Sequence, residues 1–401
     1  MNMHSSSSSR KLRGMLALGD FEAAARQHLP RPIFGFIAGM AEDGRACEGA
    51  RAAFDAWALL PQALIDVSGR SQTVQLLGQR FASPFGIAPM GLSALSAYRG
   101  DLVQARAARA ARVPMILSGT SLIRLEEVLA EAPDTWFQAY LPGVVPRIDA
   151  LLDRVAAAGC RTLVLTVDVP LPGNRENNLR AGFSTPLKPS ARLAWDGLSR
   201  PRWLLGTFAR TLLQHGMLHF ENSFAERGAP LVSSRAVRDL AARDHLSWEH
   251  VRHIRRRWRG ALVLKGILRP TDALAAREAG VDGLIVSNHG GRQLDGVAAP
   301  LAVLPGIVDA VPDLDVMLDG GVRRGTDVLK ALALGARAVF VGRPLNYAAA
   351  IGGEAGVGHA LGLLRAEVDR DMALLGVTSC STIGRHHLLA RQPASDALRQ
   401  A

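Results

Sequence analysis

The feature that most constrains the fold of this chain is an alternation of short apolar runs with longer amphipathic segments. Eight apolar runs recur, at residues 81–89, 113–118, 135–140, 162–168, 261–265, 283–287, 315–319 and 338–342. Most are followed by a segment with Ala, Leu and Arg at helical spacing, as at residues 102–111, 148–158, 273–279 and 325–334. A strand followed by a helix, repeated eight times, predicts parallel strands joined by right-handed crossovers.

Eight such units predict the α/β class and a (β/α)8 TIM barrel, built as a single domain over residues 15–390. An open doubly wound sheet is the alternative, but no GxGxxG pattern follows the first apolar run. Residues 15–80 precede the barrel and include a predicted helix at 21–28 and a polar, turn-prone stretch at 41–49. Residues 180–247 form a long insertion after the fourth strand, as expected of a lid or a docking surface.

Charge and cysteine content limit the classes of function. Lys and Arg outnumber Asp and Glu by 47 to 36, which leaves a net charge of +11 and suits nucleic acid, an anionic membrane or anionic ligands. Three cysteines without a CxxC motif predict neither a disulfide framework nor a metal site.

The ends of the chain are expected to be tails: residues 1–14, serine-rich, basic and disordered, and residues 391–401. No apolar core of a signal peptide and no run of about 18 apolar residues is present. We therefore expect a cytoplasmic protein, either soluble or peripheral on the inner membrane face.

Polar residues gather where the apolar runs end. In a TIM barrel the chemistry lies at the carboxyl ends of the strands. The polar ends are Gln138 with Tyr140, Thr166 with Asp168, Lys265, Ser287 to Arg292, Asp319 to Arg323, and Gly342 with Arg343. A single Tyr or Asp at a strand end is more often a helix cap or a turn residue, but six polar ends out of eight favour one shared site.

The last two strand ends favour a phosphate site. Asp319-Gly320-Gly321-Val322-Arg323 and Gly342-Arg343 follow the seventh and eighth strands, the usual phosphate-binding corner of this fold. Glycine lets backbone N–H groups approach phosphate oxygens, and arginine binds them bidentately. Glycine also serves ordinary tight turns, so the paired position carries the prediction.

The string Ser287-Asn-His-Gly-Gly-Arg-Gln-Leu-Asp295 resembles the signature of the FMN-dependent 2-hydroxy-acid oxidase and dehydrogenase family, which includes glycolate oxidase, lactate dehydrogenase and mandelate dehydrogenase. The resemblance extends over residues 21–384. Residues 193–197 (Leu-Ala-Trp-Asp-Gly) and 201–203 (Pro-Arg-Trp) are most similar to the mandelate and membrane-linked lactate dehydrogenase branch. The resemblance implies FMN as the cofactor and a 2-hydroxy acid as the substrate. It also implies a homo-oligomer, because members of the family form tetramers.

The resemblance also implies roles for residues of the site. His289 matches the catalytic base that removes the substrate proton, and Asp168 the carboxylate that stabilises the resulting imidazolium. Tyr140 matches a tyrosine beside substrate and flavin, while Arg292 and Arg175 match the pair that clamps the substrate carboxylate.

Cofactor contacts follow in the same way. Lys265 matches a lysine near the flavin ring, and the pyrimidine end of that ring or the flavin phosphate would supply the anion that a buried lysine needs. The implied hydrogen-bonding partners of the ring are Ser118, Gln138, Thr166 and Ser287, and the implied ribityl and phosphate contacts are Asp319, Gly321, Arg323, Gly342 and Arg343. Further implied cofactor contacts are Pro89, Met90, Gly91 and Gly320.

Three positions carry information about the branch. Phe36 stands where the family usually has a tyrosine that binds the substrate carboxylate, so one hydrogen bond to a charged group, worth about 1.5–3 kcal/mol, is lost. A bulkier substrate could recover that affinity by burial at about 25 cal/mol per Å². Met90 replaces the usual Thr. Gly91 is Ala in typical oxidases of the family and Gly in the mandelate dehydrogenase branch, which favours an acceptor other than oxygen.

These observations predict oxidation of an L-2-hydroxy acid, lactate- or mandelate-like, with electrons passed to a quinone or another non-oxygen acceptor. The alternatives are an oxidase that releases hydrogen peroxide, a basic RNA-directed flavin-barrel reductase and a non-catalytic flavin-binding relative. Aromatic residues are only 5% of the chain, which disfavours base stacking and hence a nucleic-acid partner. Within the insertion, apolar residues crowd the stretch from Trp203 to Leu218, with Arg200, Arg202 and Arg210 close to them in sequence, as in a packed lid or a patch that lies on an anionic membrane.

Overall fold

The computed structural model describes residues 12–236 and 242–391. Most of the predicted N-terminal tail and the C-terminal tail from residue 392 onward lie outside these ranges. The prediction of a disordered tail is wrong at Leu12, which is 8% exposed and whose side chain lies beside Gly352. The described chain is therefore already part of the core at its first residue.

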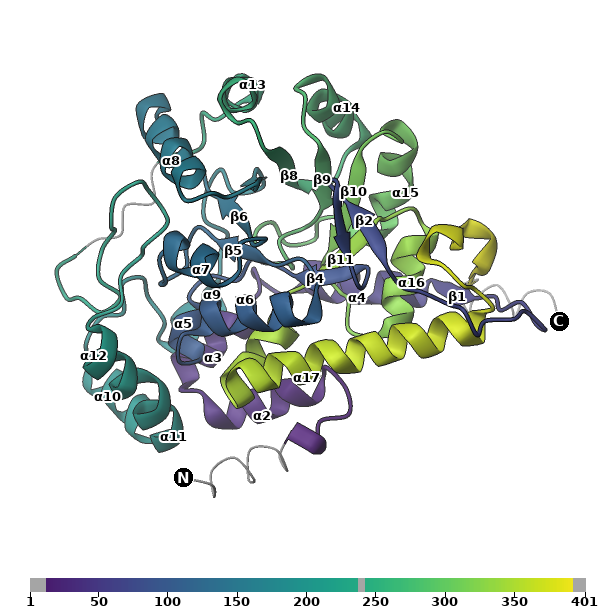
Figure 1. Cartoon of the computed structure of the whole chain (residues 1–401). Coiled ribbons are helices and arrows are strands. Elements are labelled where there is room, and N and C mark those ends of the chain that lie inside the picture. The colour runs from purple at the N-terminus through teal and green to yellow at the C-terminus, as the bar shows by residue number, and fades with distance from the viewer. Residues whose placement is uncertain (1–11, 237–241, 392–401) are drawn as a thin grey trace.

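Eight parallel strands form one sheet in the order β4-β11-β10-β9-β8-β7-β6-β5 (Figure 1). Their bounds are β4 (Phe85–Ile87), β5 (Ile116–Ser118), β6 (Trp136–Ala139), β7 (Thr162–Thr166), β8 (Ala261–Ile267), β9 (Gly283–Val286), β10 (Asp315–Asp319) and β11 (Ala338–Val341). A parallel bridge between Ile87 and Met115 joins the two edges of the sheet. This closure confirms the predicted TIM barrel.

Helices surround the barrel, as the amphipathic segments predict. They are α6 (Gly100–Ala111), α7 (Leu125–Glu131), α8 (Val145–Ala157), α13 (Trp248–Arg257), α14 (Pro270–Glu278), α15 (Pro300–Ala310), α16 (Gly325–Ala333) and α17 (Arg343–Leu375). The last of these is two helices joined across Gly353, whose φ of 55° and ψ of −138° are not helical.

The strands are apolar on both faces because one face packs on the helices and the other fills the barrel. Strands β5 to β11 each contribute to the inner cluster, which includes Trp136, Met317 and Phe340, and Ala88 joins it directly after β4. The hairpin of β2 (Val74–Leu76) and β3 (Gln79–Phe81) adds Leu76 and Phe81 to that cluster. The predicted first strand is therefore wrong at its start, since Phe81 belongs to the hairpin and the barrel strand begins at Phe85.

The segment before the barrel is mostly helical. It contains α2 (Asp20–His28), α3 (Arg31–Ala38), α4 (Arg45–Asp55) and β1 (Trp57–Leu59), and α5 (Ser93–Ser96) follows β4. The predicted turn-prone stretch at 41–49 is wrong from Arg45 onward, because α4 begins there and buries Ala46, Cys47, Ala50 and Phe54. After α17 the chain forms η2 (Cys380–Thr382), η3 (Arg385–His387) and β12 (Leu388–Ala390), which pairs with β1.

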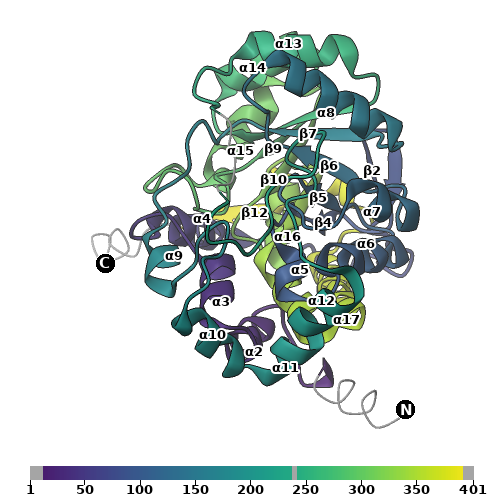
Figure 2. The ribbon, with the colours of Figure 1, turned by 90° about the vertical axis from the view of Figure 1, so that its left-hand side faces the viewer.

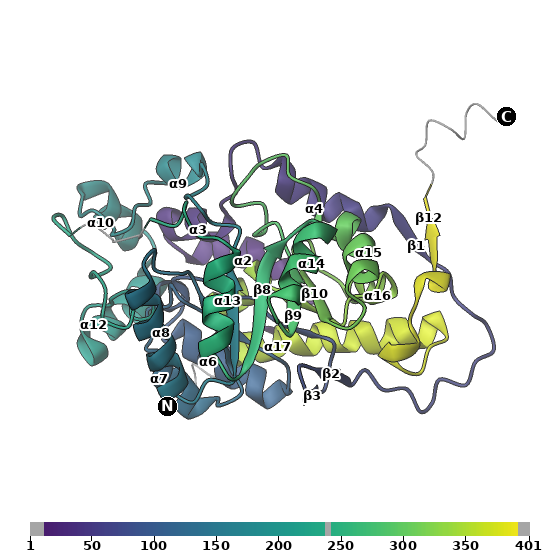
Figure 3. The same cartoon turned by 90° about the horizontal axis from the view of Figure 1, so that it is seen from above.

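The insertion after β7 carries α9 (Glu176–Ala181), α10 (Ala191–Leu198), α11 (Pro201–Trp203), the π-helix η1 (Leu204–Ala209) and α12 (Arg210–His215). Figure 2 shows α9 and α10 beside α3, and Figure 3 shows α10 and α12 at the opposite end of the molecule from the β1–β12 pair. Trp203 is buried and donates its indole N–H to the Leu95 carbonyl, 2.8 Å away. Leu205 and Leu213 remain 68% and 87% exposed, so the apolar stretch is a packed lid only in part.

Candidate active site

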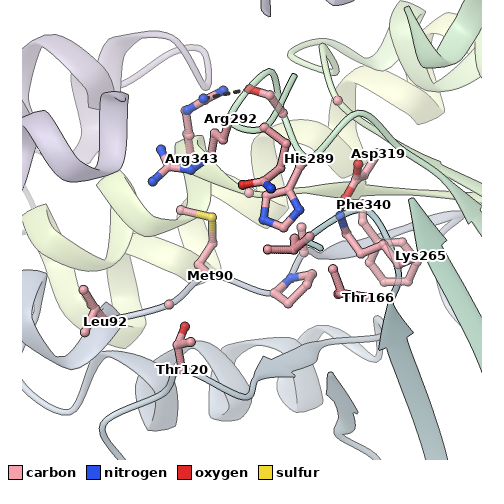
Figure 4. Close-up of a pocket in the computed structure, with 18 of the residues that line it drawn as sticks. Met90, Leu92, Thr120, Thr166, Lys265, His289, Arg292, Asp319, Phe340 and Arg343 are labelled. Atoms are coloured by element: carbon pink, nitrogen blue, oxygen red, sulfur yellow. Dashed lines mark hydrogen bonds and ion pairs between the residues drawn. The ribbon is translucent and has the colours of Figure 1, made fainter. Parts of the chain in front are cut away.

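A cavity of about 250 Å³ opens at the carboxyl ends of the barrel strands (Figure 4). The predicted site residues that line it are Phe36, Pro89, Met90, Gly91, Tyr140, Thr166, Arg175, Lys265, His289, Arg292, Asp319, Gly320, Gly321, Arg323, Gly342 and Arg343. Ser118, Gln138, Asp168 and Ser287 are not in its lining, but each is hydrogen-bonded to a neighbour at its edge. The structure thus gathers all the predicted site residues in one place.

His289 and Asp168 form a largely buried pair, with 3.0 Å between Nδ1 and Oδ1 and each side chain 15% exposed. Burial lowers the pKa of His289 below its usual value, and Lys265 and Arg175 add to the effect, although Asp168 opposes it. The imidazole is therefore neutral at neutral pH. Because Nδ1 donates its hydrogen to Asp168, Nε2 keeps a lone pair and lies 3.4 Å from the Tyr140 hydroxyl.

The backbone around His289 is held in an uncommon conformation. His289 has a φ of 57°, followed by Gly290 at 65° and Gly291 at 71°, which costs free energy for a residue with a side chain. The Ser287 hydroxyl accepts a hydrogen bond from the His289 N–H at 3.0 Å. A Cβ on Gly291 would lie 2.6 Å from the Cys47 nitrogen, so glycine lets the loop press against α4.

Lys265 is a buried cation with protein partners. Its Nζ lies 2.8 Å from the Ser287 Oγ and 3.1 Å from the Asp319 Oδ2. Burial alone would lower the pKa of Lys265, but Asp319 and Asp168 raise it above its usual value. Asp319 thus supplies an anionic partner for the lysine in addition to the expected flavin. Its second oxygen, Oδ1, has no partner among the described residues, so the expected contact of Asp319 with the cofactor stays a prediction.

Several buried polar atoms of this region lack a partner among the described residues: Gln138 Nε2, Thr166 Oγ1, Asp168 Oδ2 and Asp319 Oδ1. An unpaired buried polar group costs about 1–3 kcal/mol, so such a cluster indicates a ligand that completes the bonds. An amide N–H, a hydroxyl and carboxylate oxygens are suitable partners for the carbonyls, ring nitrogens and hydroxyls of a flavin. The residues present therefore fit FMN.

The corner after β10 and β11 fits its phosphate. Gly320 and Gly321 have φ values of 101° and 86°, and a Cβ on Gly321 would overlap the Ala50 carbonyl. Burial, with the charges of Arg51 and Arg343, lowers the pKa of Arg323 to about 10. Within residues 12–236 and 242–391, neither Arg323 nor Arg343 has a carboxylate within ion-pair distance, so both are available to an anionic group.

Two further arginines meet beside His289. Arg292 donates from Nη1 to the Gly39 and Ile37 carbonyls at 2.6 and 3.2 Å, and Arg175 donates from Nε to the Arg292 carbonyl at 2.8 Å. Burial, together with the charges of Arg175 and Arg343, lowers the pKa of Arg292 well below its usual value. Arg175, Arg292 and Arg343 are thus three neighbouring cations, and this arrangement favours an anion between them, such as a carboxylate.

Phe36 lies in the same wall of the cavity. The Arg292 guanidinium carbon is 5.1 Å from its ring centroid, and Phe183 stacks on the ring at 4.5 Å. The aromatic ring thus supports Arg292 from one side, where the usual tyrosine would also offer a hydroxyl.

Sequence reasoning missed several lining residues, among them Thr120, Arg243 and Gln293. Gln293 stands inside the diagnostic string, and Thr120 follows Ser118 by two positions, so proximity to known candidates was a usable signal. Arg243 lies at the end of the insertion, with its guanidinium carbon 5.2 Å from the Tyr140 ring centroid. Nothing in the sequence indicated that it returns to the cavity.

Two searches place the chain among known sequences. The model of a family described as FMN-dependent dehydrogenase matches residues 25–390. The L-lactate dehydrogenase of Caulobacter vibrioides (strain NA1000 / CB15N) is 41% identical over 382 residues, which cover 93% of this chain and 97% of that protein. The (S)-mandelate dehydrogenase of Pseudomonas putida is 36% identical over 372 residues, which cover 92% of each chain.

Solved structures agree with these relatives. A crystal structure of the monotopic membrane protein (S)-mandelate dehydrogenase superposes with a TM-score of 0.86 at 35% identity, covering 94% of this chain and 99% of that one. A mandelate oxidase bound to (S)-2-phenylpropionate gives a TM-score of 0.77 at 36% identity, covering 94% and 98%. No helix in residues 12–236 and 242–391 is long and apolar enough to cross a membrane.

Proposed function

We propose a function from the premise that the chain belongs to the FMN-dependent dehydrogenase family, whose model matches residues 25–390. The protein oxidises an L-2-hydroxy acid, lactate- or mandelate-like, to the 2-oxo acid, and it passes the electrons to an acceptor other than oxygen. The observation that carries the proposal is one cavity that holds a neutral, carboxylate-oriented histidine beside two half-buried arginines, Arg175 and Arg292.

Each residue has a defined task in this reaction. Arg292 and Arg175 bind the substrate carboxylate and so place the hydroxyl near His289 Nε2, which accepts the hydroxyl proton. Asp168 then stabilises the imidazolium through the Nδ1 hydrogen bond. Bound FMN supplies the acceptor for the hydrogen and electron pair from the substrate carbon, with Lys265 as the positive charge near it. Tyr140 lies within reach of His289 and borders the cavity.

A non-oxygen acceptor such as a quinone is favoured by Gly91, the residue found in the mandelate dehydrogenase branch. An oxidase that releases hydrogen peroxide remains the second candidate, supported by the structural likeness to mandelate oxidase. A homo-oligomer and a cytoplasmic location stay predictions.

We also infer peripheral contact with an anionic membrane through the insertion. The exposed large apolar side chains among its described residues are Trp195, Leu198, Leu205, Leu213 and Met217. Exposed arginines at 192, 202 and 210 lie in the same segment. Apolar side chains between cationic ones are typical of a surface that lies in the lipid headgroup region. The monotopic (S)-mandelate dehydrogenase structure supports the same reading.

The deciding experiment is anaerobic mixing of the FMN-loaded protein with a panel of 2-hydroxy acids. Bleaching of the flavin absorption by L-lactate or (S)-mandelate is the expected result, and readmission of air then separates an oxidase from a dehydrogenase by the rate of recolouring. A protein that binds no FMN, or a bound flavin that no 2-hydroxy acid bleaches, would refute the proposal.

A further inference from the structure

The wall of the cavity between β4 and β5 contains Gly91, a glycine at a position where the backbone conformation does not require glycine. Gly91 does not have a positive φ, so an alanine there would meet no conformational penalty. The obstacle is a neighbouring side chain. A Cβ on Gly91 would overlap the Thr120 Oγ1 and lie 3.3 Å from the Thr120 Cβ.

The Thr120 hydroxyl begins a short chain of hydrogen bonds. Thr120 Oγ1 lies 3.0 Å from Ser118 Oγ, and Ser118 Oγ donates to Gln138 Oε1 at 3.2 Å. A serine hydroxyl has one hydrogen, which Gln138 takes, so Thr120 is the donor in the first bond. The chain of donors therefore runs from Thr120 to Ser118 to Gln138.

The Gly119 N–H, which can only donate, identifies the Gln138 atom that faces it as the oxygen. Gln138 Oε1 accepts from Ser118 and from the Gly119 N–H at 3.4 Å, so its Nε2 is the atom left without a partner among the described residues. Figure 4 shows Thr120 beside Met90 and Leu92, on the side of the cavity away from Lys265 and Asp319. The Gly119 N–H and the chain of donors from Thr120 through Ser118 thus hold Gln138 Oε1 together, which leaves Nε2 as the donor available to a ligand.

We propose that Thr120 is a positioning residue for the cofactor: its hydroxyl, acting through Ser118, orients Gln138 as a hydrogen-bond donor to the flavin, and Gly91 is present because that hydroxyl occupies the space of a side chain at 91. The inference rests on FMN as the cofactor in the proposed function. It makes Gly91 and Thr120 one unit, in which a methyl group at 91 acts by turning the Thr120 hydroxyl away from Ser118.

The test measures the dissociation constant of FMN on reconstitution of the apoprotein, together with the visible absorption bands of the bound flavin. Thr120→Val keeps the shape and removes the hydroxyl, so FMN should bind about five- to tenfold more weakly, the effect of one ordinary hydrogen bond. Thr120→Ser should stay within about twofold of the parent protein. The melting temperature of the apoprotein should not change in either variant, whereas a merely structural role would lower it.

Coupling is tested with Gly91→Ala, Thr120→Ala and the double variant. Each single change should weaken FMN binding by a similar factor, and the double variant should be no more than about twofold worse than Thr120→Ala alone, because the added methyl then has room. Gly362→Ala is the matched control, since a Cβ there meets nothing within 4 Å, and it should leave FMN binding unchanged.

The inference is overturned if Thr120→Val binds FMN as tightly as the parent with the same spectrum, or if the effects of Gly91→Ala and Thr120→Ala multiply. If Gly91→Ala alone does not fold, the double variant should fold, and its failure would equally overturn the pairing. A parent protein that binds no FMN would refute the proposed function itself, which separates the two failures.

Discussion

Phe36→Tyr restores the hydroxyl that the family usually has beside the substrate carboxylate, and it tests whether α3 enters the site. Phe36 borders the cavity, with the Arg292 guanidinium carbon 5.1 Å from its ring centroid. A new hydroxyl on that ring would donate to the carboxylate that Arg292 binds. A hydrogen bond to a charged group contributes about 1.5–3 kcal/mol, which corresponds to about a 10- to 150-fold change in affinity.

We expect a change in affinity at the low end of that range, because the new hydroxyl loses its hydrogen bonds to water when the substrate binds and because Phe183, stacked on the ring, restricts its position. KM for L-lactate should fall about tenfold while kcat changes little, since the carboxylate is bound equally in ground and transition states. The assay is steady-state reduction of an artificial electron acceptor over a range of lactate concentrations. Phe34→Tyr is the matched control on the same helix, because Phe34 stacks on Tyr347 outside the cavity lining. An unchanged KM for both lactate and mandelate in Phe36→Tyr would mean that this segment does not reach the substrate.

Three further predictions concern the base, its titration and the insertion. His289→Gln should retain FMN and lose flavin reduction by at least about a hundredfold, measured by anaerobic stopped-flow, and near-normal turnover would remove His289 as the base. Because the pKa of His289 is lowered, its basic form persists below the usual histidine range, so the reduction rate should fall only at more acidic pH. A rate that already halves near the ordinary histidine pKa would contradict this. Leu205→Glu with Leu213→Glu should abolish salt-sensitive co-sedimentation with phosphatidylglycerol vesicles, and a parent protein that sediments with neither anionic nor neutral vesicles would refute membrane contact.

The barrel could be predicted because its strands are buried on both faces, so each is a compact apolar run with a polar end. The errors occur where tertiary contacts override that pattern. Phe81 is as apolar as the strand that follows, but it lies in a hairpin that fills the end of the barrel. Residues from Arg45 to Asp55 carry polar and small residues typical of turns, yet they form a helix that buries one face.

The site was predictable from strand ends and from one diagnostic string, because both are local in sequence. The contacts between site residues were not. Asp319 and Lys265 lie on β10 and β8, and no local pattern indicates that their side chains pair at 3.1 Å. The same holds for Thr120 and Gly91, since only the close packing of two loops shows why a glycine is needed where φ is ordinary.

The charges of the site favour anionic ligands. Arg175, Arg292, Arg323 and Arg343 surround the cavity, while Asp168 and Asp319 are engaged with His289 and Lys265. The pKa values of Arg292 and Arg323 are lowered because burial and neighbouring cations oppose their charge. That cost is relieved by ligands that bring negative charge, so a phosphate in one corner stabilises the charge of Arg323, and a carboxylate beside His289 stabilises that of Arg292. Because both ligands are anions, each also lowers the positive potential that attracts the other, and the site therefore needs separate arginines for the phosphate and for the carboxylate.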